Sequence, residues 1–343
     1  EPLRSHVCDR LGPTGADTLA TSLTSGELAT LCQLPSAELP GYTVVEAARF
    51  DVAIATPSKD PVSLGRVLDR GAPSGDWFSL ARDDFTRHGL IVGATGSGKT
   101  NTLFALLDRL HDAGRGVPFL VIEPAKAEYR DLLAVRDGRG QPRFPTLRVY
   151  TLGDERYAPF RLNPFEFEIA TPPPGAAAQP EERVHVQTHI DYLKSVFNAA
   201  FVLYAPMPYI LDTCLHEIYT DKGWSLISGH NRYLPDDERG HEARWPVFPT
   251  LTDLYEKIDA VVERLGYDER IRMDVTAGLK ARIGSLRLGN KGLMLDTSHS
   301  IPMDELLAHP TVLELERMGN DDEKAFVIGL LLARLYEYRL IQA

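Results

Sequence analysis

The octapeptide from Gly93 to Thr100, GATGSGKT, constrains the fold of this chain more than any other segment. It fits the pattern GxxxxGK[ST] in full, with an apolar run, HGLIVG, before it and a helical pattern after it. Glycines at 93, 96 and 98 permit backbone conformations that other residues avoid, so successive N–H groups can turn toward one anion. The sequence therefore predicts a strand, a phosphate-binding loop and a helix in succession.

The loop residues have distinct expected roles toward ATP and Mg²⁺. The N-terminus of the following helix contributes a positive dipole end to the phosphates. Lys99 is expected to place its ammonium group on the β- and γ-phosphates, and Thr100 its hydroxyl on Mg²⁺. The complete expected nucleotide-binding set is Gly93, Ala94, Thr95, Gly96, Ser97, Gly98, Lys99, Thr100 and Asn101.

The segments after the loop alternate between helix and strand patterns. Leu103, Leu106, Leu107 and Leu110 recur at helical spacing, and VPFLVIEP, AEYRDLL and LRVYTLG follow as strand, short helix and strand. Nearer the C-terminus, GLMLD and TVLELE are predicted strands, and EKAFVIGLLLARLYEYR is a predicted helix. Such alternation is typical of an α/β fold, a parallel sheet with helices on its faces.

Composition shifts predict four regions. Residues 1–80 form a small N-terminal region with a short helix in SLTSGELATLCQL, a strand in AARFDVAIAT and turn-rich connectors at PSKDP and RGAPSGD. Residues 81–165 are the first part of the α/β core. Residues 166–250 open with a proline-rich linker and continue as a helical insertion, and residues 251–343 return to the core.

Charge and cysteine content indicate the cellular compartment of the protein more than its activity. The formal net charge of −11 neither supports nor excludes DNA binding, because basic groups can converge on a channel in an acidic protein. No apolar stretch approaches the roughly 20 residues that span a bilayer. Three separated cysteines, Cys8, Cys32 and Cys214, favour a reducing cytoplasm over a disulfide framework.

Several segments together resemble the HerA/FtsK group of ring-forming DNA translocases, especially its bacterial HerA-like branch, over residues 60–343. They are FTRHGLIVGATGSGKTNT, VIEPAKAEYR, RLNPFEF, LRLGNKGLML and VLELERMGNDDEKAFVIGLLLARLYEYR. The resemblance implies a RecA-like (ASCE) P-loop core, a homo-hexameric ring and ATP-driven movement on double-stranded DNA. It also implies a partner, either a NurA-like nuclease or a sirtuin-like or other effector in phage defence.

The resemblance also implies site residues outside the loop. Glu128 matches the acidic residue at the end of the second core strand, where a carboxylate could polarise the attacking water; Glu123, at the strand end itself, is the rival. Arg87 matches an arginine that acts across the subunit boundary, and Arg282 is a second candidate. The proposed catalytic set is therefore Lys99, Glu128 and Arg87.

Two further features of the sequence bear on function. Relatives place an apolar strand with paired carboxylates, Walker B, after the last helix, so we expect it beyond Ala343. Asp296 in GLMLD imitates this motif, and we interpret it as a structural residue. Arg136, Arg139 and Arg143 would suit a DNA-facing loop, but Asp137 dilutes the cluster, and a solvated turn is the favoured interpretation.

Two alternatives to a DNA translocase remain open at this point. One is an ATPase of conjugative or type IV secretion, working at the membrane through a partner. The other is a nucleotide-binding ring scaffold that organises an effector without translocation. A small-molecule kinase is disfavoured because neither a lid nor substrate-binding arginines can be identified in the sequence.

Overall fold

The structure is a computed structural model that describes five segments and two single residues. These are residues 59–69, 72–112, 117–169, 186–234 and 247–342, together with Thr24 and Gly26. Apart from those two residues, the helix expected in residues 22–34 lies outside the described part of the chain, and so does the strand expected in residues 47–56. The described residues fall into two units. One holds Thr24, Gly26 and those between 66 and 77, and the other holds 59–65 and those from 78 onward.

A two-stranded sheet precedes the core. It pairs β1 (Pro61–Asp69) with β2 (Ala72–Ala81), and the 3₁₀ turn η1 (Arg82–Thr86) follows. The prediction of a turn-rich connector at RGAPSGD was wrong in part, because the last five residues of this segment belong to β2. Turn-forming residues concealed a strand that is stabilised by cross-strand contacts, such as the guanidinium of Arg66 5.5 Å from the ring centroid of Trp77.

A three-stranded parallel sheet lies at the centre of the larger unit. Its strands are β3 (Leu120–Glu123), β4 (Arg148–Thr151) and β5 (Thr311–Glu314). β5 lies between the other two, and Glu314 is the register partner of both Glu123 and Thr151. The strands predicted at VPFLVIEP, LRVYTLG and TVLELE are confirmed. Because all three run parallel, their carboxyl ends meet at one edge.

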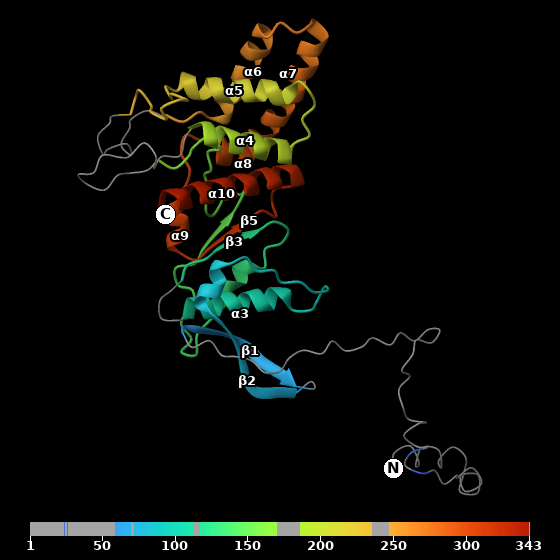
Figure 1. Cartoon of the computed structure of the whole chain (residues 1–343), viewed down its shortest axis with the longest axis vertical. Coiled ribbons are helices and arrows are strands. Elements are labelled where there is room, and N and C mark those ends of the chain that lie inside the picture. The colour runs from blue at the N-terminus through green and yellow to red at the C-terminus, as the bar shows by residue number, and fades with distance from the viewer. Residues whose placement is uncertain are drawn as a thin grey trace. The chain divides into compact units, whose positions relative to one another are not determined.

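Helices cover this sheet in successive layers. They are α4 (Val186–Ala200), α5 (Met207–Asp221), α6 (Leu251–Arg264), α7 (Glu269–Leu286) and α10 (Asp321–Gln342). α10 contacts α4, α4 contacts α5, α5 contacts α6, and α6 contacts α7, a succession that can be followed in Figure 1. Aromatic packing joins the first pair, with the rings of Phe197 and Phe326 4.7 Å apart. These helices confirm the prediction of helices from the 3.6-residue periodicity of the sequence.

The segment GLMLD was predicted as a strand, and this prediction was wrong. It ends the short helix α8 (Gly289–Leu295), which is followed by α9 (Met303–Ala308). Met294 and Leu295 are fully buried. A short apolar run fits a buried helix as well as a buried strand, so periodicity alone does not separate the two.

The strand predicted immediately before the phosphate loop is also absent from the structure. Residues 88–94 have no regular secondary structure, and Leu90 and Val92 are 86% and 76% exposed. A strand requires a hydrogen-bonded neighbour, and none of the described strands pairs with this run. The apolar sequence alone was therefore insufficient to define a strand here.

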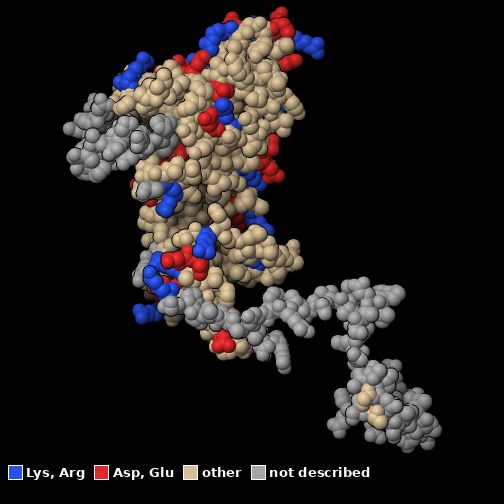
Figure 2. All heavy atoms as spheres, in the orientation of Figure 1, with Lys and Arg blue, Asp and Glu red and all other residues tan. Residues whose placement is uncertain are grey.

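The surface carries both signs of charge. On the face drawn in Figure 2, lysine and arginine side chains are interspersed with aspartate and glutamate. Among the described helices, none has both the length and the apolar content to cross a membrane.

Candidate active site

The loop from Gly93 to Thr100 adopts a conformation that depends on its glycines. Gly96 and Gly98 have φ angles of 80° and 92°, in the left-handed region that other residues avoid. At Gly93 an added Cβ would lie only 2.3 Å from the Oγ of Ser97. The Ser97 N–H donates to the Ala94 carbonyl at 3.2 Å and closes the turn. The three glycines of the loop thus each have a steric reason in this structure.

The loop leads directly into helix α3 (Lys99–Asp112), so Lys99 and Thr100 occupy its first turn. The ammonium of Lys99 reaches back over the loop and donates to the carbonyls of Gly93 and Ala94, both at 2.8 Å. Residues 93–97 are exposed. A cation, a helix N-terminus and an accessible glycine loop therefore meet in one place, which is the arrangement that binds phosphate groups.

Glu128 lies beside this loop, although 28 residues separate it from Thr100 in the sequence. Its carboxylate accepts a hydrogen bond from the ammonium of Lys126 at 2.6 Å. Hydrogen bonds from Lys126 first and from the Thr100 hydroxyl second lower the pKa of Glu128. The rings of Phe104, on α3, and Tyr129 pack edge to face with centroids 5.1 Å apart. The packing of Tyr129 on α3 therefore places Glu128 near Thr100, the residue expected to hold Mg²⁺.

Glu123, the rival carboxylate, is engaged elsewhere. It ends β3, is buried, and accepts the backbone N–H groups of Glu128 at 2.8 Å and Tyr129 at 3.3 Å. These bonds satisfy N–H groups at the start of the 3₁₀ turn η2 (Tyr129–Ala134). Glu123 therefore acts as a cap for the segment that carries Glu128.

Asp296, interpreted from the sequence as a structural residue, lies in a network of hydrogen bonds, and its role stays a prediction. Its carboxylate accepts the backbone N–H of Thr252 at 2.9 Å, the Thr252 hydroxyl at 2.6 Å and the Nε of Arg287 at 3.2 Å. These bonds join the end of α8 to the first turn of α6 and to Arg287, the C-cap residue of α7. The three hydrogen bonds of the carboxylate therefore serve a junction of helices.

Replacing Asp296 with asparagine is expected to lower the free energy of unfolding without slowing ATP hydrolysis. The change removes a charge that accepts three hydrogen bonds, and bonds to charged groups contribute about 1.5–3 kcal/mol each. Chemical denaturation of the variant measures the loss, and a turnover assay at a temperature where it remains folded serves as the control. Loss of hydrolysis in a fully stable variant would contradict the structural role.

The two candidate arginines differ in their surroundings. Arg87 is exposed and follows η1, with its backbone N–H donating to the Asp84 carbonyl at 3.3 Å. Arg282 instead donates to the carbonyls of Gly278 at 2.7 Å and Val202 at 2.8 Å. Arg282 thus connects α7 to the segment after α4 within one chain, whereas Arg87 remains the candidate for action across a subunit boundary.

The basic loop at residues 135–143 is an ordered turn. Asp137 accepts the backbone N–H groups of Arg139 and Gln141, both at 2.8 Å. The guanidinium of Arg136 donates to the carbonyl of Leu133 at 2.8 Å, and Arg143 pairs with Asp108 of α3 at 2.5 Å. Most of the loop's polar groups therefore stabilise the turn and its contact with α3.

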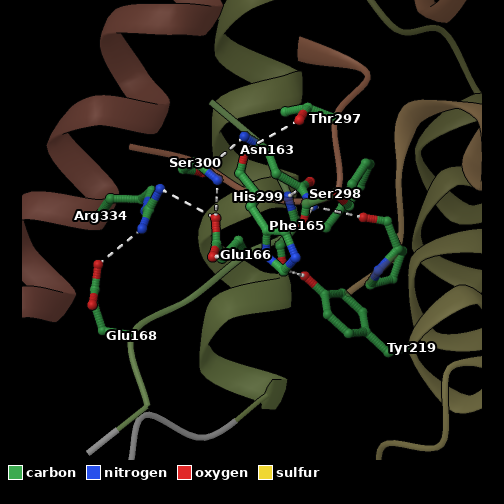
Figure 3. A network of polar contacts seen from close by, with 11 residues as sticks. Asn163, Phe165, Glu166, Glu168, Tyr219, Thr297, Ser298, His299, Ser300 and Arg334 are labelled. Atoms are coloured by element: carbon green, nitrogen blue, oxygen red, sulfur yellow. Dashed lines mark hydrogen bonds and ion pairs between the residues drawn. The ribbon is translucent and has the colours of Figure 1, made fainter. Parts of the chain in front are cut away.

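The segment RLNPFEF, residues 161–167, is one of those that carry the family resemblance. It forms a largely buried polar network (Figure 3). The Asn163 side chain donates to the carbonyl of Pro249 at 3.0 Å and accepts the Phe165 N–H at 2.9 Å. Glu166 accepts the Ser300 N–H at 2.6 Å, and Arg334 of α10 approaches Glu166 at 3.7 Å and Glu168 at 2.9 Å. This segment therefore connects α10 to the loops that flank α6 and α8.

The fold and the loop together define the class. A parallel sheet with helical layers and a complete phosphate loop at a helix N-terminus is the architecture of a P-loop ATPase domain. A family model described as helicase HerA, central domain, matches residues 78–335, and the chain belongs to this family.

A solved structure shares this fold. VirB4 of Thermoanaerobacter pseudethanolicus is 17% identical to this chain, with a TM-score of 0.52 over 83% of this chain and 65% of VirB4. The chain thus spans about two thirds of the length of that protein. Among curated proteins, none matches it significantly.

Proposed function

We propose that this protein is the ATP-hydrolysing motor of a HerA-like DNA translocase. The observation that carries the ATP-hydrolysing part of the proposal is the convergence of Lys99, Thr100 and Glu128 at the phosphate loop. A phosphate-binding cation, a hydroxyl for a metal ion and an ionised carboxylate are the groups that phosphoryl transfer to water requires.

Each residue has a proposed role toward ATP. Backbone N–H groups from Gly93 to Gly98 surround the phosphates, and Lys99 moves from the loop carbonyls to the β- and γ-phosphates. Thr100 and Asn101, in the first turn of α3, complete the phosphate and Mg²⁺ site. When bound, Mg²⁺ neutralises charge on the phosphate oxygens. Glu128 orients the attacking water and accepts its proton.

The translocase assignment rests on family membership. A homo-hexamer would let Arg87 of one subunit reach the phosphates held by its neighbour, where a cation stabilises the charge that develops during transfer. Double-stranded DNA is the proposed substrate of movement, and a nuclease or sirtuin-like defence effector is the proposed partner. The fold shared with VirB4 is also compatible with the secretion ATPase, which stays the second candidate.

Duplex DNA is expected to raise the rate of ATP hydrolysis, and its binding is expected to weaken steeply with salt. Acidic and basic groups are interspersed on the face in Figure 2, and we propose that the DNA phosphates contact cations that several subunits bring together. Light scattering with nucleotide should then show a hexamer under the same conditions.

The measurement is phosphate release with and without duplex DNA across a salt series. Arg87→Ala is the matched variant, since it should lower hydrolysis in the assembled ring while each subunit still binds ATP. A strict monomer, or a hexamer whose hydrolysis ignores DNA, would contradict the translocase and favour the secretion or scaffold alternatives.

A further inference from the structure

The segment that carries Glu128 is held by two adjacent strand ends. We name residues 126–134, which include η2, the Glu128 turn. Glu123 at the end of β3 accepts the backbone N–H groups of Glu128 and Tyr129. Its register partner on β5, Glu314, holds the same turn through the side chain of Arg130.

The second of these attachments is an ion pair with a buried carboxylate. Arg130 Nε donates to Glu314 Oε1 at 2.8 Å, and its Nη2 donates to Oε2. The Thr151 hydroxyl, at the end of β4, donates to Glu314 Oε2 at 2.8 Å. Glu314 has no exposed surface. Burial acts to raise its pKa, yet the hydrogen bonds from Arg130 and Thr151 outweigh burial and lower it.

Geometry and burial indicate which contact determines the position of the turn. A guanidinium that bonds a carboxylate through two nitrogens fixes orientation as well as distance. The ion pair between Lys126 and Glu128 has less capacity to do so, because it is a single contact between two exposed side chains and such pairs contribute little. Arg130 is itself 46% exposed, but its partner Glu314 is fully buried. Beside the backbone bonds to Glu123, the orientation of the turn therefore depends on Arg130 and Glu314.

We propose that Arg130 and Glu314 are positioning residues, which hold the Glu128 carboxylate toward Thr100 at the phosphate loop. The inference rests on the proposed role of Glu128 in hydrolysis. Arg130 follows Glu128 by two residues, so a shift of its side chain moves the backbone that carries the carboxylate. Its partners in the structure, Glu314 and Thr151, lie at the carboxyl edge of the sheet and not in the phosphate loop. The pair therefore affects turnover and not nucleotide affinity.

Arg130→Gln and Glu314→Gln are each expected to lower kcat on the order of 10²-fold, because small misplacements of a reacting group cost about this much. The KM for ATP should remain unchanged. When Glu128 has already been replaced by glutamine, Arg130→Gln should cause no further loss. Independent losses that multiply in the double variant would overturn the proposal.

Hydrogen–deuterium exchange provides a readout that does not depend on activity. Arg130→Gln should speed exchange at the amides of Glu128 and Tyr129, which lose their fixed geometry at Glu123. Arg156→Gln is the matched control, because Arg156 makes a similar two-nitrogen pair with Asp154 after β4. The control should leave both exchange and turnover unchanged. Unaltered exchange in Arg130→Gln would overturn the positioning role.

A conservative variant keeps the test decisive if Arg130→Gln fails to fold. Arg130→Lys retains the charge that Glu314 needs but not the paired nitrogens, and should lower kcat in the same direction by a smaller factor. Normal kcat in Arg130→Lys would then count against the proposal. Normal turnover in Glu128→Gln would instead contradict the proposed function, so the two failures are distinguishable.

Discussion

Replacing Lys99 with alanine is expected to abolish ATP binding in a protein that remains folded. The Lys99 ammonium makes two hydrogen bonds to loop carbonyls, and it would exchange these for phosphate oxygens. Charge-assisted hydrogen bonds are worth about 1.5–3 kcal/mol each. With about 1.4 kcal/mol per tenfold change, losing two such contacts weakens binding on the order of 10²-fold or more. Calorimetric titration with ATP and Mg²⁺ measures the change.

The control for this variant is a lysine in the first turn of another helix. Lys324 in α10 pairs with Asp321 at 3.4 Å, and Lys324→Ala should bind ATP normally. Thermal melting should show both variants folded, because Lys99 bonds to an exposed loop. A folded Lys99→Ala protein with the affinity of the parent would exclude the loop as the nucleotide site.

Replacing Glu128 with glutamine is expected to retain ATP binding and to reduce turnover by about 10²–10⁴, the usual contribution of an acid–base group. Glutamine keeps the shape of the side chain and removes its charge. The lowered pKa of Glu128 keeps the carboxylate ionised at neutral pH, so the substitution removes a charge that is present during turnover. Single-turnover phosphate release separates this loss from any change in binding.

Variants of two other carboxylates serve as controls for Glu128→Gln. Asp296→Asn should leave turnover unchanged, since Asp296 serves the junction of α6 and α8. Glu123→Gln should slow turnover less than Glu128→Gln, since Glu123 acts on the backbone of the turn. If Asp296→Asn stops hydrolysis in a stable protein while Glu128→Gln does not, the roles assigned here are reversed.

Periodicity was sufficient for the long elements. The spacing of Leu103, Leu106, Leu107 and Leu110 predicted α3, and its N-terminus at Lys99 follows from the glycine pattern. The three apolar runs of the sheet were also predicted correctly. In these segments local preference and packing agree, although only β5 is buried along its whole length, while the leucines of α3 and all of β4 are half-buried.

Where the sequence misled, the missing information was non-local. The run at 89–92 has the composition of a strand, but a strand exists only with a paired neighbour, and the described strands pair elsewhere. In GLMLD, burial of Met294 and Leu295 is satisfied by a helix. The boundaries predicted at residues 165 and 250 remain predictions.

The candidate site was predictable only in part, for a similar reason. The phosphate loop is local, so its residues and their glycine conformations follow from eight consecutive positions. The pairing of Arg130 with Glu314 joins residues 184 apart in the sequence, and no short pattern indicates it. Glu128 was found through resemblance to relatives, whereas its contact with Thr100 required the packing of η2 against α3.

A structure of the protein with a non-hydrolysable ATP analogue and Mg²⁺ would show directly whether Lys99, Thr100 and Glu128 meet the nucleotide. We expect phosphates within the loop from Gly93 to Thr100, with Lys99 released from the Gly93 and Ala94 carbonyls to contact them. We also expect Mg²⁺ at the Thr100 hydroxyl and the Glu128 carboxylate facing the γ-phosphate. Nucleotide bound outside this loop, or Glu128 directed away from the γ-phosphate in the bound state, would contradict the proposed site.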